Sequence, residues 1–208
     1  MIIHDTIDNI YNKFLNDFPG CKEALTVAQP IKSGQKHYQA LALYGIASRY
    51  NYHNSNILEL GTAAGYSAAM IAQGAPLARI TTLNPRKGEY ELAKENLKPF
   101  PNVQVIAMCS WDYEAVYWGQ DFDFIFVDGN HGLILRDMPW FNWLKTGGTI
   151  LFHDYGPVYY IPIYEAVNNF AAKLGRALDI MIMDTDTQSG MAGLVRRAGE
   201  QWMTECPG

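Results

Sequence analysis

The most constraining feature of this sequence is the stretch formed by residues 56–72, which reads NILELGTAAGYSAAMIA. Its first five residues are apolar enough for a buried strand, and small apolar residues from Tyr66 onward favour a helix. Gly61 and Gly65 would make the turn between them, where the backbone can approach a ligand closely. The N-terminus of the following helix offers free N–H groups to an anion. The same pattern also fits a turn that only packs.

The spacing of these glycines argues against one class of ligand. With alanines at positions 63 and 64, the turn lacks the G-x-G-x-x-G pattern that receives a pyrophosphate. A dinucleotide cofactor, and with it an NAD-dependent oxidoreductase, is therefore disfavoured.

Length and composition limit the remaining possibilities. The chain has 208 residues, of which 49% are hydrophobic and 18% charged, and this fits one globular domain. The net charge of -5 gives no basic surface for nucleic acid or an anionic membrane. The chain has an odd number of cysteines, and they are widely spaced: Cys21, Cys109 and Cys206. This pattern argues against a disulfide framework and favours a reducing compartment. The first residues carry no long apolar run, so we expect a soluble, cytoplasmic protein without a membrane span.

Helices are expected ahead of the sheet, in residues 1–50. Apolar residues at helical spacing between Ile7 and Phe18 predict an amphipathic helix that packs on the domain or on a second subunit, which leaves a homodimer open. Residues 21–34 have no clear period and are interpreted as a connection that could fold over an active site. Residues 37–50 return to a helical period.

From residue 51 onward, predicted strands and helices alternate. This order predicts an α/β fold with a doubly wound, Rossmann-like, mostly parallel sheet, closed by a C-terminal antiparallel hairpin. We expect seven strands and a single domain, with an α/β core in residues 51–197 and a loose tail in residues 198–208. The strands are predicted at residues 56–60, 78–83, 103–108, 122–127, 149–152, 178–183 and 191–195. Later helices are predicted at residues 133–144 and 163–174. A further helix is predicted after Asn84, which would be its N-cap.

Acidic residues follow two neighbouring predicted strands. Asp128 lies in the segment FDFIFVDGNH, and Asp154 lies in LKTGGTILFHDY. Ligands of such sheets bind at the carboxyl ends of the strands. Two carboxylates that converge there can hold a hard divalent cation such as Mg²⁺. Each acid alone could instead cap a helix or bond to a loop.

These segments together resemble the motifs of class I S-adenosylmethionine (SAM)-dependent methyltransferases. The sequence ELGTAAG at residues 59–65 is similar to the family's first motif, whose glycine loop wraps the methionine end of SAM. The two acidic segments extend the resemblance to small O-methyltransferases of the catechol O-methyltransferase-like and cephalosporin- or macrolide-modifying type. The resemblance implies a SAM-dependent enzyme that methylates a hydroxyl group of a small molecule, with Mg²⁺ as a candidate second cofactor.

The resemblance also assigns cofactor-binding residues. Asn84 is a departure, because the family places an acid there to grip the ribose; an asparagine would bind ribose more weakly or only cap the next helix. Trp111 could flank the adenine or belong to the core. The full set is Glu59, Gly61, Thr62, Gly65, Tyr66, Ser67, Asn84, Ser110, Trp111 and Asp128.

Catalysis is assigned to Asp128 and His131. By the resemblance, Asp128 and Asp154 would bind the metal, and the third ligand is left open. His131 stands at the offset where catechol-type enzymes have a basic lysine, so it would deprotonate the acceptor; a hydrogen bond within the loop is the alternative.

The acceptor site is expected near His153, Tyr155 and Tyr159. His153 would be a ligand of a softer metal or no ligand at all. Aromatic residues such as Trp140 are more typical of the core. A degenerate SAM-binding or interaction module without catalysis is the competing interpretation, favoured by Asn84 and by the open third metal ligand.

Overall fold

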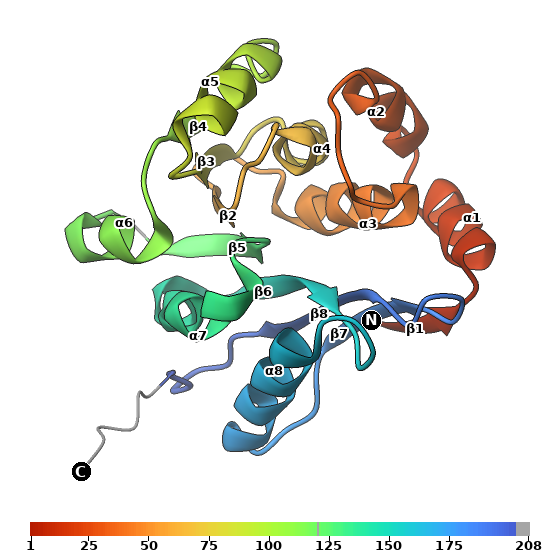
Figure 1. Ribbon diagram of the computed structural model, residues 1–208, viewed down its shortest axis with the longest axis vertical. Helices are drawn as coiled ribbons and strands as arrows, with labels where there is room; N and C mark the ends of the chain where they lie inside the picture. Colours follow the sequence, from red (N-terminus) through yellow and green to blue (C-terminus); the bar gives the residue numbers. More distant parts are fainter. Residues whose placement is uncertain (120, 203–208) are drawn as a thin grey trace.

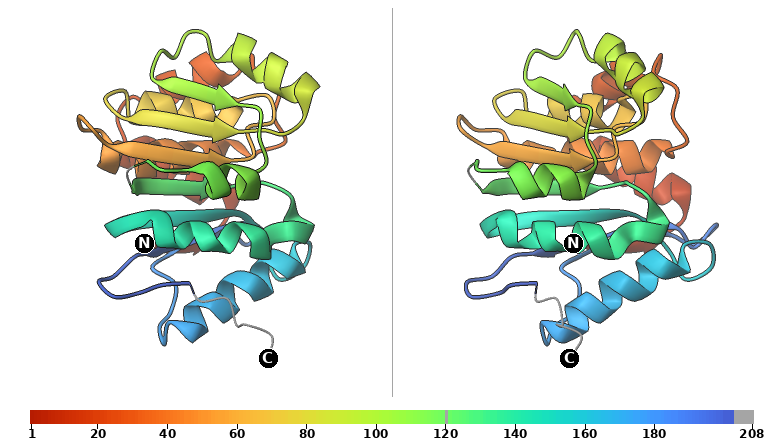
Figure 2. Two further views of the ribbon diagram at one scale, coloured as in Figure 1. Left: turned by 90° about the vertical axis from the view of Figure 1, so that its left-hand side faces the viewer. Right: turned by 60° about the vertical axis from the view of Figure 1, so that its left-hand side comes forward.

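One eight-stranded sheet runs through the protein in the order β1-β7-β8-β6-β5-β2-β3-β4 (Figures 1 and 2). The computed structural model describes residues 1–119 and 121–202. Strand pairs are parallel except where β8 meets β6 and β7. The mostly parallel sheet and its antiparallel C-terminal hairpin confirm the predicted fold class. The strands are β1 (Ile2–Asp5), β2 (Asn56–Leu60), β3 (Arg79–Leu83), β4 (Val103–Ile106), β5 (Phe122–Val127), β6 (Leu144–Tyr155), β7 (Ile180–Asp184) and β8 (Gly190–Val195).

Helices cover both faces of the sheet (Figure 1). The sheet has a hydrophobic core on each face, and successive side chains of β5 point into different cores. Phe124 and Phe126 pack in the core with α1 to α5, whereas Ile125 and Val127 pack in the core with α7 and α8. A strand buried on both faces is mostly apolar, as β5 is apart from Asp123, and this is why its bounds match the prediction. The helices are α1 (Ile7–Asp17), α2 (Cys21–Ala28), α3 (His37–Ala47), α4 (Tyr66–Gly74), α5 (Lys87–Asn96), α6 (Ser110–Val116), α7 (Ile134–Asp137) and α8 (Ile161–Lys173).

The predicted number of seven strands is wrong, because β1 adds an eighth. Its residues pair in parallel with β7, from Ile2 opposite Met181 to Asp5 opposite Asp184. The strand is short and mostly exposed, so it has no alternating burial pattern that a sequence could reveal. The first 50 residues therefore contribute to the sheet as well as to helices.

The helices of two segments differ from the prediction. Residues 21–28, interpreted as a connection, form α2, whose buried side chains include Cys21 and Leu25. The helix predicted at residues 133–144 is instead broken into α7 and two 3-10 turns, His131–Leu133 and Met138–Trp143. Pro139 stands in the second turn, where it supplies no backbone N–H for a continuous α-helix.

Three boundaries also shift. Strand β6 begins five residues earlier than predicted, at Leu144, and runs on to Tyr155. Helix α5 begins at Lys87 with Arg86 as N-cap, so Asn84 is not its cap. Part of the predicted loose tail is held in place, because Trp202 packs edge-on against Phe170 with the ring centres 4.9 Å apart. Cys206 lies outside the described residues.

None of the described helices has the length and apolar character needed to cross a membrane.

Candidate functional site

Two adjoining cavities lie at the carboxyl ends of β2, β3, β5 and β6. The first has a volume of about 520 Å³ and reaches Ser67, Asp154 and Tyr160. The second has a volume of about 550 Å³ and reaches Asn84 and Trp111. They form one continuous cleft, since they share Gly61, Ala63, Glu89, Asp128 and His131.

The glycine loop forms one wall of the first cavity. Thr62, Tyr66 and Ser67 line it, at the N-terminus of α4, where backbone N–H groups lack helical partners. Gly61 has a φ of +101°, and a Cβ there would lie 2.2 Å from the carbonyl oxygen of Asp128. Only glycine fits this approach between the loop and the end of β5. Gly65, with a φ of +94°, shapes the start of α4 and is not among the lining residues.

Glu59 lies behind the loop and does not line either cavity. Its side chain is fully buried and accepts a hydrogen bond from Thr82, whose hydroxyl also bonds to that of Thr62. Burial raises the pKa of Glu59 to about 7. This acid supports the loop through two hydroxyl groups rather than touching a ligand.

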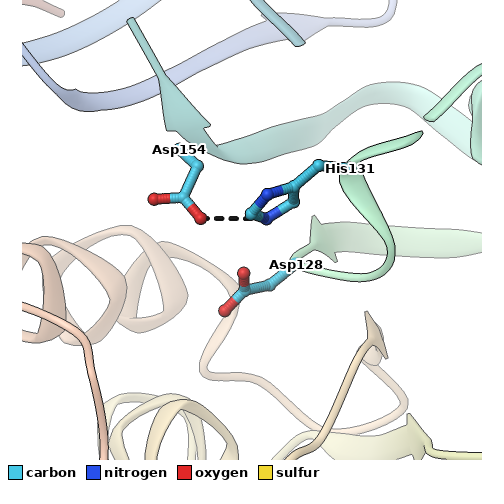
Figure 3. Close-up of side chains that lie close together, drawn as sticks. All are labelled: Asp128, His131 and Asp154. Carbon is cyan, nitrogen blue, oxygen red and sulfur yellow. Dashed lines mark ion pairs between the residues drawn. The ribbon is translucent and has the colours of Figure 1, made fainter. Parts of the chain in front are cut away.

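A charged cluster lines the same cavity as the glycine loop. Asp128 and Asp154 extend from the ends of β5 and β6, and His131 extends from the loop after β5 (Figure 3). His131 Nε2 lies 2.9 Å from Asp154 Oδ2. The buried His153 places Nδ1 3.2 Å from both Asp128 Oδ1 and Asp154 Oδ2. Two histidines therefore share two carboxylates.

These contacts shift the pKa values in a consistent direction. Hydrogen bonding to Asp154 raises the pKa of His131 above its usual range. Burial alone would lower the pKa of His153, but the carboxylates of Asp128 and Asp154 outweigh it and raise the value. Burial alone would raise the pKa of Asp154, yet the close contacts with both histidines hold it well below its usual range. The cluster thus keeps Asp154 ionised.

The donor atoms of the cluster could hold a cation. Ligand atoms of Asp128, His131 and Asp154 all lie within 4.8 Å of one another. Asp154 has a φ of +52°, an uncommon conformation for a residue other than glycine, and such strain is typical of functional positions. Two carboxylates satisfy the usual protein share of an Mg²⁺ site, and the imidazole also suits a transition metal such as Mn²⁺.

Of the residues predicted to contact adenosine, two line the cleft and one does not. Asn84 and Trp111 line the second cavity. The guanidinium of Arg136 lies 5.0 Å from the centre of the Trp111 ring. Ser110 bonds to Asp137 instead and does not line either cavity.

The residues predicted for the acceptor site also separate. His153 lines the first cavity. Tyr155 is buried, and its hydroxyl bonds to Asn168, whereas Tyr159 is 71% exposed; neither lines the cleft. Their neighbour Tyr160 does, with its ring edge-on to His131 at 5.3 Å between the centres. Trp140 is fully buried, as predicted for a core residue.

Several residues of the cleft were not singled out by sequence reasoning, among them Gln35, Glu89 and Tyr160. Gln35 donates a hydrogen bond of 3.0 Å to Asp128 Oδ2, and residues 32–35 line the first cavity. Their segment was expected to be able to cover an active site, but no motif singled out Gln35. Glu89 and Tyr160 carry no motif either. Their proximity arises from chain connections that only the folded structure defines.

The comparisons with known proteins agree with this geometry. A family model described as a methyltransferase domain matches residues 58–155, which contain the glycine loop and both acidic strand ends. Malonyl-[acyl-carrier protein] O-methyltransferase 1 of Ilyobacter polytropus is 28% identical over 159 residues, which are 74% of this chain and 57% of that protein. This chain therefore spans less than two thirds of the relative's length.

Solved structures share the fold. An O-methyltransferase from Bacillus cereus in complex with S-adenosylhomocysteine (SAH) aligns with a TM-score of 0.66 at 20% identity, covering 88% of this chain and 96% of that one. TomG of Streptomyces achromogenes, in complex with SAM, aligns with a TM-score of 0.64 at 20% identity, covering 86% and 90%. Cofactor-bound Rv0187 from MTB aligns with a TM-score of 0.67 at 22% identity, covering 88% and 92%.

Proposed function

We propose, from the premise that this chain is a class I SAM-dependent methyltransferase, that it transfers a methyl group to a hydroxyl oxygen of a small-molecule acceptor. The observation that carries the proposal is the position of His131: it contacts Asp154 in the same cavity that the glycine loop lines. The relative from Ilyobacter polytropus and the structural neighbours from Bacillus cereus and Streptomyces achromogenes are named O-methyltransferases, which supports oxygen as the acceptor atom.

The cleft has matching groups for each part of SAM. The free N–H groups at the start of α4, beside Tyr66 and Ser67, suit the carboxylate of its methionine part. Asp128, shared by both cavities, suits the ammonium group. The adenosine would occupy the second cavity near Trp111, whose ring offers an apolar surface. This arrangement leaves the sulfonium methyl near the charged cluster.

His131 would act as the general base. Bound SAM would supply the methyl group to the acceptor oxygen and would leave as SAH, and His131 would take the proton that the acceptor hydroxyl gives up. Asp154 fixes the ring of His131 through the 2.9 Å contact and stabilises the imidazolium that forms. His153 in turn holds the two carboxylates together. Positioning of the acceptor in line with the methyl group supplies much of the acceleration.

A divalent cation fits the same cluster. Asp128 and Asp154 would hold it through their carboxylate oxygens, the ligands that Mg²⁺ prefers, and His131 would stay free to act as the base. When bound, the cation would lower the pKa of an acceptor hydroxyl and stabilise the resulting oxyanion.

The partner proposed is a small neutral or weakly polar acceptor. The net charge of -5 provides no surface for a polyanion such as nucleic acid. The acceptor would enter beside Tyr160 and Gln35, which line the first cavity near His131. The shape of this entrance, rather than the cofactor loop, would select the substrate.

The test is calorimetry with SAM, SAH and NAD, followed by measurement of SAH release with a panel of phenols, alcohols and thioesterified carboxylic acids. SAM binding and turnover on a hydroxyl oxygen support the proposal, whereas turnover on a carboxyl oxygen alone contradicts the hydroxyl acceptor. Binding of NAD in place of SAM contradicts it. SAM binding without turnover on any acceptor favours the non-catalytic module.

A further inference from the structure

The end of β3 carries an amide where a carboxylate would be expected to hold the ribose. We propose that Glu89, in the first turn of α5, supplies this carboxylate instead, and that Asn84 is its positioning residue. The inference rests on SAM as the cofactor. It assigns to Glu89 the recognition of the two ribose hydroxyls, a role that the residue at the strand end cannot fill here.

Glu89 has the right place in the cleft. It is one of the residues that line both cavities, together with Gly61, Ala63, Asp128 and His131. A cofactor whose methionine part lies in the first cavity and whose adenine lies in the second must place its ribose where the two meet. The carboxylate of Glu89 is therefore available at the ribose position.

Asn84 is already fully engaged and cannot hold the ribose itself. Only 3% of this residue is exposed. Its side-chain oxygen accepts the N–H of Arg86 at 3.0 Å, and its Nδ2 lies 3.0 Å from Glu89 Oε2 and 3.4 Å from the carbonyl oxygen of Ala63. An amide used in this way has little capacity left for a pair of hydroxyl groups.

The same contacts prepare Glu89 as an acceptor. The hydrogen bond from Asn84 lowers the pKa of Glu89, so the side chain is ionised at neutral pH. Arg86 Nη1 pairs with Glu89 Oε1 at 3.0 Å, but the Arg86 side chain is 77% exposed and can move aside. A carboxylate has four lone-pair positions, so it can accept two hydroxyl donors while it keeps the bond from Asn84.

This pairing explains why position 84 carries an amide. An aspartate at position 84 would place its oxygen atoms about 3 Å from those of Glu89, judged from the present contact. Two like charges at that separation would repel each other. Asparagine removes the repulsion and donates the hydrogen bond that fixes Glu89.

The experiment compares ligands with and without ribose hydroxyls. Affinities of adenosine and 2′,3′-dideoxyadenosine are measured by competition against SAH in calorimetry, for the wild type, Glu89→Gln and the control Glu91→Gln. Glu91 is exposed on the same helix and does not line either cavity. We expect Glu89→Gln to weaken SAH and adenosine about tenfold, because a charge-assisted hydrogen bond becomes a neutral one. Dideoxyadenosine should bind equally well to all three proteins.

A charge exchange sharpens the test. Asn84→Asp alone should weaken SAH binding, whereas Asn84→Asp combined with Glu89→Gln should restore it, since the pair again holds one carboxylate and one amide. An equal loss for adenosine and dideoxyadenosine in Glu89→Gln, with an unchanged melting temperature, overturns the ribose role. Wild-type binding of SAH with no effect of Glu89→Gln overturns this inference alone, whereas absence of SAH and SAM binding in the wild type overturns the proposed function too.

Discussion

Two acidic residues on strands that β5 separates in the sheet have pKa values shifted in opposite directions. Glu59 on β2 is fully buried behind the glycine loop, and burial raises its pKa to about 7. Asp154 at the end of β6 is held ionised by two histidines. The side of the cleft that the glycine loop lines, called the cofactor wall below for its proposed role, is thus backed by a nearly neutral acid. The side formed by Asp128, His131 and Asp154, called the charged wall, is a cluster of charges. On the proposed function, the first would bind SAM by its shape and the second would perform the chemistry.

The largest expected effect separates the chemistry from cofactor binding. His131→Gln should lower the rate at neutral pH about a thousandfold, the middle of the range for a general base. The loss should be much smaller at high pH, where the acceptor hydroxyl ionises unaided. SAM affinity, measured by calorimetry, should stay at the wild-type value. A loss of equal size at every pH would mark His131 as structural.

The cofactor wall should show its character in the pH dependence of stability. The folded protein holds a proton on Glu59 that the unfolded chain releases above its ordinary pKa of 4.5. The contribution of this group is therefore complete below about pH 4.5 and is lost as the pH rises through about 7. The loss is about 3 kcal/mol from a shift of this size. Chemical denaturation of the wild type and Glu59→Gln between pH 5 and pH 8 measures it as a difference.

If Glu59 is the cause, the variant loses less stability than the wild type over that interval. Parallel curves for the two proteins would assign the pH dependence to other buried acids such as Asp137, whose pKa burial raises to about 6.

Adding a single methyl group at Gly61 should disrupt the conformation of the glycine loop. Gly61→Ala should lower the free energy of unfolding by about 2 kcal/mol and abolish SAM binding, because the new Cβ collides with the carbonyl oxygen of Asp128 at an unfavourable φ. Gly88→Ala is the matched control, since a Cβ there meets no atom within 4 Å and alanine favours the helix. Equal stability of the two variants would contradict the packing argument.

Metal removal should affect only the charged wall. Excess EDTA is expected to lower turnover about tenfold, within the several kcal/mol that a cation can supply, and to leave SAM affinity unchanged. Mg²⁺ should restore activity, because Asp128 and Asp154 supply the carboxylate oxygens that this ion prefers. Full activity in excess EDTA would remove the cation from the mechanism and leave Asp128 as a contact to the SAM ammonium.

The sequence by itself determined the central strands and the glycine loop. Residues 56–60 and 122–127 have the bounds of β2 and β5 because a strand buried on both faces is mostly apolar, and this composition is visible locally despite Glu59 and Asp123. The loop depends on Gly61 and Gly65, whose positive φ values other residues rarely adopt. The acids at positions 128 and 154 were visible for the same reason, since each directly follows or ends such a run.

Only the tertiary structure decided which polar groups meet. Strand β1 exists because it pairs with β7, and the contacts of His131 with Asp154, of Gln35 with Asp128 and of Asn84 with Glu89 depend on how separate segments pack. Hydrogen bonds between side chains extend about 3 Å, so their partners are fixed by the crossing of the chain rather than by local preference. An isolated sequence shows the residue types available at the sheet edge, whereas the fold selects the pairs that they form.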